Sequence, residues 1–224
     1  MKDTPLSTCE RDFILKAIEE KKRLDGRQTY DYRKIKISFG TDYGCCFPPK
    51  RGDHVFQHRA VASGLPRVRA GKSELSVKLN RQLERCLRNS KCIDTESLCV
   101  VSGEKVWQIR VDVHMLNNDG NLMDASSVAA IAALCHFRRP DVAVQGEEVT
   151  VYSPEERDPI PLSIYHMPIS VSFSFFQQGT YLLVDPCERE ERVMDGLLMI
   201  AMNKHREICS IQNNKNLAKN LAKK

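Results

Sequence analysis

Three stretches of this chain carry apolar residues at the spacing of an α-helix. At the start of the first stretch, Ser7 and Glu10 form a capping-box sequence, in which each side chain can bond the free backbone N–H of the other residue. The third stretch is apolar almost all round, so we expect a buried helix that lies close to a sheet. The predicted helices span about residues 7–26, 75–89 and 128–137.

Other stretches alternate apolar and polar residues, which is the pattern of a half-buried strand. Over residues 169–176, the alternation predicts that Val171, Phe173 and Phe175 face the core. Two of the predicted strands, 98–101 and 106–116, flank a short turn and predict a β-hairpin. Helices and strands together predict an α+β fold. The predicted strands span about residues 32–39, 98–101, 106–116, 169–176, 181–184 and 197–202.

Composition and charge exclude few classes of function. The formal net charge of +5 and the isoelectric point near 8.7 permit a polyanionic partner without requiring one. The nine cysteines are odd in number, and no secretory signal precedes them, so we expect free thiols in a reducing, intracellular setting. No Cys-x2-Cys pair is present, so we expect no metal and no cofactor. No apolar run is long enough for a membrane span.

Residues 47–76 have no sustained period, and they are rich in basic side chains. They are either a basic loop that contacts RNA or a disordered segment, and their composition favours disorder. Residues 213–224 form a basic tail with a repeated Asn-Leu-Ala-Lys sequence. The basic residues of the 47–76 segment are Lys50, Arg51, Arg59, Arg67, Arg69 and Lys72.

The predicted helix over 75–89 has a second stripe, which is basic. Its members, Lys78, Arg81, Arg85 and Arg88, recur at helical spacing and share one face. Such a stripe can follow a phosphate backbone, and it can equally be an ordinary solvated face. With Arg110 of the predicted hairpin, these residues are the candidate RNA contacts.

Several short motifs together resemble RNase PH-like subunits of the eukaryotic RNA exosome. The resemblance covers residues 1–46 and 77–212, and it does not extend to residues 47–76 or beyond 213. It implies an RNase PH-like β-α-β-α domain (ribosomal protein S5 domain 2-like) over 1–212, interrupted at 47–76, with an incomplete first sheet. The motifs are Arg-Leu-Asp-Gly-Arg at 23–27, Asp-Tyr-Arg-Lys-Ile at 31–35, Gly-Thr-Asp-Tyr-Gly at 40–44, and the runs at 90–98, 103–107 and 185–186.

The same resemblance implies a function. It implies a place in a six-membered ring that processes and degrades RNA from the 3′ end, in rRNA maturation and mRNA decay. The implied partners are other RNase PH-like ring subunits, cap subunits and RNA, with no membrane. The implied locations are the nucleus, nucleolus and cytoplasm.

Two positions argue against catalysis. Active members of the family carry an Asp-Gly-Gly-Thr-Arg type of turn that binds the attacking phosphate, and here Met123 stands at the arginine position, followed by Asp124. Active members also carry an aspartate at a position that corresponds here to Leu197, or two residues earlier to Asp195. We therefore expect no catalytic residues. The alternatives are a phosphate-dependent 3′-to-5′ exoribonuclease and an aberrant form that does not assemble.

Overall fold

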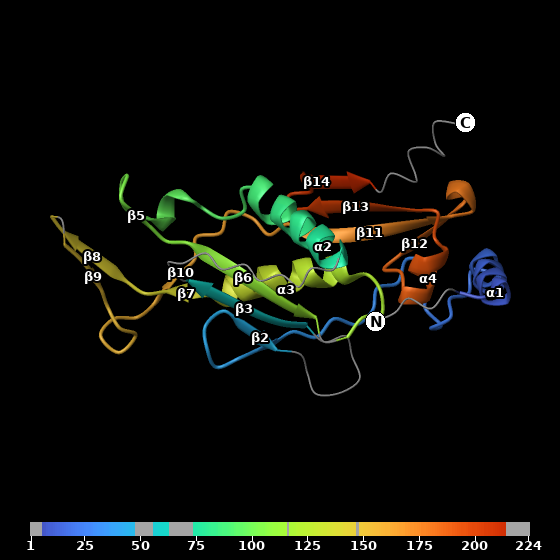
Figure 1. Cartoon of the computed structure of the whole chain (residues 1–224), viewed down its shortest axis with the longest axis horizontal. Helices are drawn as coiled ribbons and strands as arrows, with labels where there is room; N and C mark the ends of the chain where they lie inside the picture. Colours follow the sequence, from blue (N-terminus) through green and yellow to red (C-terminus); the bar gives the residue numbers. More distant parts are fainter. Residues whose placement is uncertain (1–5, 48–55, 63–73, 116, 147, 214–224) are drawn as a thin grey trace.

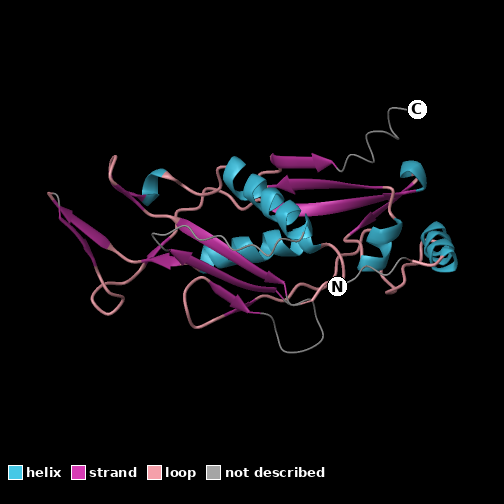
Figure 2. Ribbon diagram, in the orientation of Figure 1, coloured by secondary structure: helices cyan, strands magenta, loops and turns pink. Residues whose placement is uncertain are grey.

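Two four-stranded sheets enclose a layer of helices (Figure 1). The computed structural model describes residues 6–47, 56–62, 74–115, 117–146 and 148–213, with the backbone alone at 46–47, 56–62 and 74–76. Helix α3 (Leu122–His136) lies at the centre and contacts strands of both sheets. Helix α2 (Glu74–Glu84) lies beside α3 and continues as a π-helical turn over Arg85–Asn89. Figure 2 shows α2 and α3 in cyan between the two magenta sheets.

Both sheets are antiparallel throughout. The first has the strand order β1-β2-β3-β6, and the second has the order β12-β11-β13-β14. The strands of the first sheet are β1 (Ser38–Phe39), β2 (Cys45–Phe47), β3 (Phe56–Ala62) and β6 (Ile109–Met115). Those of the second are β11 (Ile169–Phe176), β12 (Tyr181–Val184), β13 (Gly196–Met202) and β14 (Ile208–Asn213). Short two-stranded ladders join β4 (Cys99–Val101) to β5 (Lys105–Val106), β7 (Arg138–Arg139) to β10 (Ile160–Pro161), and β8 (Val142–Gln145) to β9 (Glu148–Val151).

The helix layer buries apolar side chains against both sheets. On one side, Leu79 and Leu83 of α2 pack with Met199 of the second sheet. On the other, Leu134 of α3 packs with residues of β6. A third cluster joins α1 (Thr8–Glu19) and α4 (Glu188–Val193) to the end of the second sheet. Within the described ranges, no helix has the length and apolar content that spanning a bilayer requires.

The predicted helices are present with shifted ends. The Ser7–Glu10 capping box is confirmed, with both reciprocal hydrogen bonds formed. Helix α1 ends at Glu19 and not near Gly26, because the chain reverses and carries the Arg23 side chain into the protein. Helix α3 begins at Leu122, six residues before the predicted start at 128. The polar residues Asp124, Ser126 and Ser127 interrupt the apolar pattern there, yet they are buried together with Leu122 and Met123.

The prediction for the faces of β11 is wrong. Ser170, Ser172 and Ser174 face the core, with 4%, 1% and 0% of their surface exposed, while the side chains that alternate with them are partly exposed. The small serines let α3 lie close to the sheet, and Ser172 bonds to Asp124 of that helix. The predicted core residues Val171, Phe173 and Phe175 therefore face away from the helix layer.

The outer face of the second sheet is consequently apolar. Its exposed members include Ile169, Met202, Ile208 and Ile211, at 39–59% exposure. In the part of the chain that the structure describes, no helix covers this face (Figure 1). The usual arrangement of an antiparallel strand, with polar residues outside, is therefore inverted on β11, while the neighbouring β13 still directs Met199 and Ala201 to the helix layer.

Two strand predictions need correction. Of residues 32–39, only Ser38 and Phe39 form a strand, because Tyr32 and Arg33 direct their polar groups to α3 and to the end of β12. The predicted hairpin is limited to β4 and β5, since β6 leaves it after Gln108 and pairs with β3 in the first sheet.

The segment 47–76 contains one element that its pattern did not predict. Residues 56–62 form β3, the strand between β2 and β6, so the prediction of a patternless loop is wrong there, and the first sheet has four strands. Residues 48–55 and 63–73 lie outside the described residues, as does the basic tail from 214. Strand β14 was not predicted either, because its apolar residues are few and face the outer side.

A close backbone contact joins the turn before α3 to the start of α4. Gly120 has φ +81°, and a Cβ there would lie 2.5 Å from the backbone of Cys187 and Glu188. The Glu188 N–H donates to the Asp119 carbonyl at 3.1 Å across the same contact. Only glycine satisfies both the left-handed backbone and this approach.

We expect Gly120→Ala to destabilise the protein more than Gly103→Ala does. Gly103 has the same φ of +81° with nothing within 4 Å of the added Cβ, so its substitution carries the backbone strain alone, about 1–2 kcal/mol. The clash at Gly120 adds a further ~1–3 kcal/mol of overpacking. Urea unfolding midpoints of the two variants measure the difference, and equal losses would contradict the close contact.

Candidate functional site

Polar residues from four separate parts of the chain meet where α3 begins, next to α4 (Figure 1). They come from the segment 23–33, the turn 119–124, strand β11 and the segment 185–191. This is the place where the resemblance to the exosome subunits puts the phosphate-binding turn of active relatives. We therefore take it as the candidate site.

The Asp185 carboxylate is the acceptor that most of these residues share. Arg33 donates to both of its oxygens, from Nε at 2.8 Å and Nη2 at 2.7 Å, and its backbone N–H adds a bond of 3.0 Å. Arg27 Nη1 and Asn121 Nδ2 each donate at 2.7 Å. Burial by itself would raise the pKa of this carboxyl group, but the hydrogen bonds from Arg33 and Asn121 outweigh it and hold the pKa well below its usual range.

Arg23 and Glu190 form a second, more deeply buried pair. Each side chain is 1% exposed, and the guanidinium donates to both carboxylate oxygens at 3.0 and 2.6 Å. The remaining Arg23 N–H groups donate to the backbone carbonyls of Val184 and Asp185 at 3.0 and 2.8 Å. This pair fastens the segment after α1 to α4 and to the end of β12.

Asp124, in the first turn of α3, is the third buried carboxyl group, and it is 2% exposed. Ser172 donates to it from the backbone at 2.8 Å and from the hydroxyl at 2.7 Å, and Asn121 Nδ2 donates at 2.9 Å. The Tyr32 hydroxyl also donates to it. Burial raises the pKa of Asp124, while these donors favour its charged form. Burial and the adjacent Asp124 together raise the pKa of Tyr32.

The arrangement neutralises its own cations. Each of the three arginines donates to carboxylates or to backbone carbonyls of the same network. An anion such as phosphate would meet an excess of negative groups here, and Coulomb repulsion is strong in a dry site. In the described part of the chain, no group of His, Cys, Asp and Glu side chains could hold a metal ion. The acidic members are Asp25, Asp119, Asp124, Asp185, Glu190 and Glu191.

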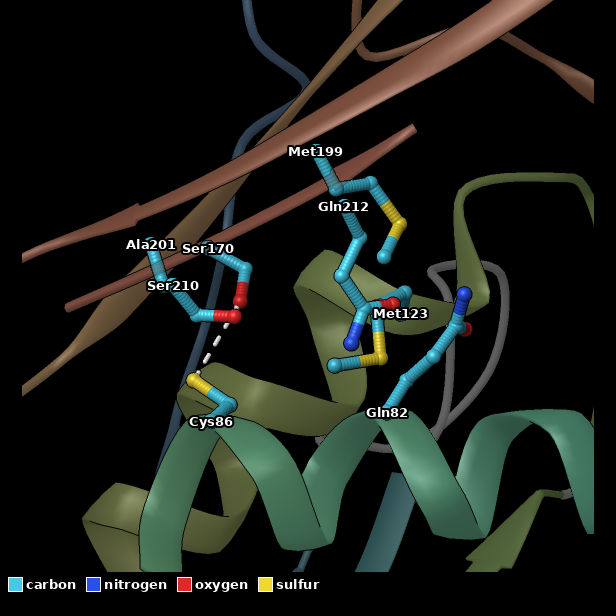
Figure 3. A pocket seen from close by; sticks show the side chains of 8 residues that line it. All are labelled: Gln82, Cys86, Met123, Ser170, Met199, Ala201, Ser210 and Gln212. Carbon is cyan, nitrogen blue, oxygen red and sulfur yellow. Dashed lines mark hydrogen bonds between the residues drawn. The ribbon is translucent and has the colours of Figure 1, made fainter. Parts of the chain in front are cut away.

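Met123 points away from this network into a small pocket between α2 and the second sheet (Figure 3). It is 6% exposed, and Leu197 packs against the same apolar cluster. The two positions that argue against catalysis are therefore joined in one apolar cluster. The pocket is lined by Gln82, Cys86, Met123, Ser170, Met199, Ala201, Ser210 and Gln212.

Asp195 is the other position considered for the missing aspartate, and it stabilises the turn between β11 and β12. Its carboxylate accepts the Gln178 backbone N–H at 2.8 Å, and its own N–H donates to the Phe175 carbonyl at 2.9 Å. Both contacts lie at the β11–β12 connection.

The structure brings four of the five predicted RNA contacts together. Lys78, Arg81, Arg85 and Arg88 are all exposed along α2 and the π-helical turn, and Arg88 pairs with Glu84 at 3.1 Å. Arg110 lies apart from them. Its neighbours along β6 face the helix layer, so alternation directs Arg110 to the other face of the first sheet, where it pairs with Asp112 at 2.8 Å.

Sequence reasoning missed most of the network residues. The segment 23–33 entered the argument only through its resemblance to a family, and Asn121, Ser172 and Glu190 were not singled out. The one local signal was the Asp-Gly-Asn turn before α3, which is typical of a left-handed backbone, and Asn121 indeed has φ +52°.

We expect Asp185→Asn to lower the free energy of unfolding at pH 7 by about 3–5 kcal/mol, because it leaves Arg27 and Arg33 without their shared carboxylate. The folded-state pKa of Asp185 is depressed, so its stabilisation is present above the unfolded value near ~3.9 and is lost as the pH falls below it. The raised pKa of Asp124 favours the folded state in acid, and it does so equally in the wild type and in Asp185→Asn.

The measurement is urea unfolding from pH 7 to pH 2. The difference between wild type and Asp185→Asn should shrink in acid, and a difference that stays constant with pH would contradict the ion network. Asp158→Asn, at an exposed carboxylate, is the control and should change neither the stability nor its pH dependence.

Comparison with known proteins agrees with the fold. The sequence model described as "3' exoribonuclease family, domain 1" matches residues 48–140, and that of domain 2 matches residues 166–216. The domain 1 match includes almost all of residues 47–76, the segment to which the resemblance carried by the short motifs does not extend. Among solved structures, the archaeal exosome titled "archaeoglobus fulgidus exosome with RNA bound to the active site" has a similar chain, with TM-score 0.71, 25% identity and 96% and 92% of the two chains covered.

Curated relatives carry the name exosome complex component RRP45. The protein of Danio rerio is 71% identical over 95% of this chain and 60% of its own length, and that of Homo sapiens is 68% identical over 95% and 54%. The chain thus spans little more than half the length of these relatives. The Schizosaccharomyces pombe protein is 42% identical, with 92% of this chain and 78% of its own length covered. The RNase PH-like fold is confirmed, and the chain belongs to the 3′ exoribonuclease family of RNase PH-like proteins.

Proposed function

We propose that this chain is a non-catalytic, RNA-contacting subunit of the RNA exosome ring, which supports 3′-to-5′ RNA processing and degradation. The names of its relatives support the exosome assignment. Its partners are then other RNase PH-like ring subunits, cap subunits and RNA. Its locations are those of the exosome that the resemblance implies, the nucleus, nucleolus and cytoplasm.

One observation carries the non-catalytic part of the proposal. Phosphorolysis requires cationic donors for the attacking phosphate and a carboxylate beside the scissile bond. At the two positions considered for these groups, Met123 and Leu197 pack in one apolar cluster. The neighbouring arginines already donate to Asp185 and Glu190. A phosphate at this site would have to displace those bonds and approach the buried Asp124.

The assay is phosphate-dependent release of nucleoside diphosphates from single-stranded RNA by the purified chain. We expect no release above the background seen without phosphate, because Arg23, Arg27 and Arg33, the arginines that the structure describes at the site, already donate to carboxylates or carbonyls of the network. A catalytically active family member, run in parallel, is the positive control. Release that depends on phosphate and is lost in Asp124→Asn would establish an exoribonuclease instead.

The RNA-contacting part rests on α2. The four basic residues of α2 and the π-helical turn that continues it, from Lys78 to Arg88, span ten helical steps, or about 15 Å of continuous surface. The opposite stripe of α2 is buried with Leu79 and Leu83, so the basic side chains are directed to solvent. A row of exposed cations of this length matches several phosphates of a single strand.

We expect removal of the four charges to weaken RNA binding in a salt-dependent manner. In Lys78→Ala/Arg81→Ala/Arg85→Ala/Arg88→Ala, the slope of log K against log salt should fall by about 0.7 per lost phosphate contact. Arg11→Ala/Lys16→Ala, on the exposed side of the distant helix α1, is the control. Arg110→Ala tests the fifth predicted contact by itself. An unchanged slope in the fourfold variant would make the stripe an ordinary solvated face.

A further inference from the structure

The basic surface of α2 continues onto a second part of the chain, more than one hundred residues later. We propose that the turn between β13 and β14 extends the RNA-contacting surface, with Lys204 and Arg206 as phosphate contacts and Lys91 between them and α2. This inference deepens the proposed function and rests on its RNA-contacting part.

The position of the turn follows from the packing of β14. This strand contacts the π-helical turn Arg85–Asn89, and Figure 1 shows the start of β14 beside the end of the α2 helix. His166 bridges the same two elements. Its Nε2 is 2.7 Å from the Ser90 carbonyl oxygen, and its Nδ1 is 4.0 Å from the thiol of Cys209. The end of the basic stripe and the β13–β14 turn are therefore held side by side.

The turn has a defined conformation that Asn203 imposes. The Asn203 side-chain oxygen accepts the N–H groups of His205 and Glu207 at 2.9 and 3.0 Å. Backbone bonds from Asn203 to Glu207 and from Arg206 to Asn203, both 3.1 Å, close the turn. Lys204, His205 and Arg206 are all exposed at its tip. A preformed turn loses little conformational entropy when it binds, which favours contact with a flexible strand.

The basic residues of the joined surface outnumber the two carboxylates that lie among them. Glu84 pairs with Arg88 at 3.1 Å, and Glu207 keeps its charge while it accepts Asn203 Nδ2 at 2.7 Å. The cations are Lys78, Arg81, Arg85, Arg88, Lys91, Lys204 and Arg206, all exposed. A polyanion that follows the α2 stripe toward its C-terminal end would reach Lys91 and then the turn.

The ligand class is a single strand and not a duplex. The surface is irregular, because its exposed cations come from a helix and from a separate turn beside the end of that helix. Single-stranded RNA can follow such a surface because its backbone bends freely, and a single-strand site on one OB fold spans about 4–16 nucleotides. A rigid duplex would present its phosphates on a straight cylinder.

The test measures binding of a single-stranded RNA of about 16 nucleotides, the upper end of that range, over a series of salt concentrations. In Lys204→Ala/Arg206→Ala the slope of log K against log salt should fall by about 1.4, from about 0.7 for each lost phosphate contact. The control Arg11→Ala/Lys16→Ala removes two charges at the far end of the molecule and should leave the slope unchanged.

The outcomes separate this inference from the proposed function. An unchanged slope in Lys204→Ala/Arg206→Ala, together with a reduced slope in the fourfold α2 variant, overturns the extension and leaves the α2 contact standing. A reduced slope in the turn variant alone supports the turn and overturns the α2 contact. Unchanged slopes in both variants overturn both. A duplex of the same length that binds as tightly as the single strand, with the same loss in the turn variant, overturns the assignment to single strands.

Discussion

The carboxylate of Asp185 accepts hydrogen bonds from Arg27, Arg33 and Asn121, which reach it from two segments far away in sequence. Because the group is buried, its charge is stable only while these donors stay in place. The donors in turn depend on the backbone near them. The turn before α3 reaches the start of α4 only because Gly120 has no side chain there. The start of α3 is thus fixed by one charged group and its donors, while apolar side chains pack the rest of the helix between the sheets.

The same constraint limits what the site can do. Arginines that an enzyme would direct at a phosphate are directed here at Asp185, at Glu190 and at backbone carbonyls, at distances of 2.6–3.2 Å. Freeing Arg23 would leave the buried Glu190 carboxylate without its cation, and freeing Arg27 or Arg33 would remove one of the two cations on Asp185. The network therefore fixes the N-terminal segment, the start of α3 and α4 to one another. Recognition of RNA, as proposed here, uses other cations, on the exposed side of α2.

The burial of serines on the inner face of β11 follows from the same network. Asp124 must accept hydrogen bonds inside the helix layer, and Ser172 supplies two of them from β11. The alternation of the strand then places Ser170 and Ser174 on the buried side as well. The larger side chains of the strand are left to the outer face. The inner face of β11 is therefore formed largely by small serine side chains, and α3 can approach this strand more closely.

The sequence by itself determined the features that depend on neighbours two to four positions away. These are the capping box of α1, the buried stripe of α2 and the apolar character of α3, because helical and strand periodicities are local. Short motifs also indicated the family. Only the tertiary structure decided which face of β11 is buried, where β6 pairs, and which carboxylates bind the arginines. Arg23 and Glu190 are 167 positions apart, and no local pattern records a bond between such residues. Only the folded chain brings them together.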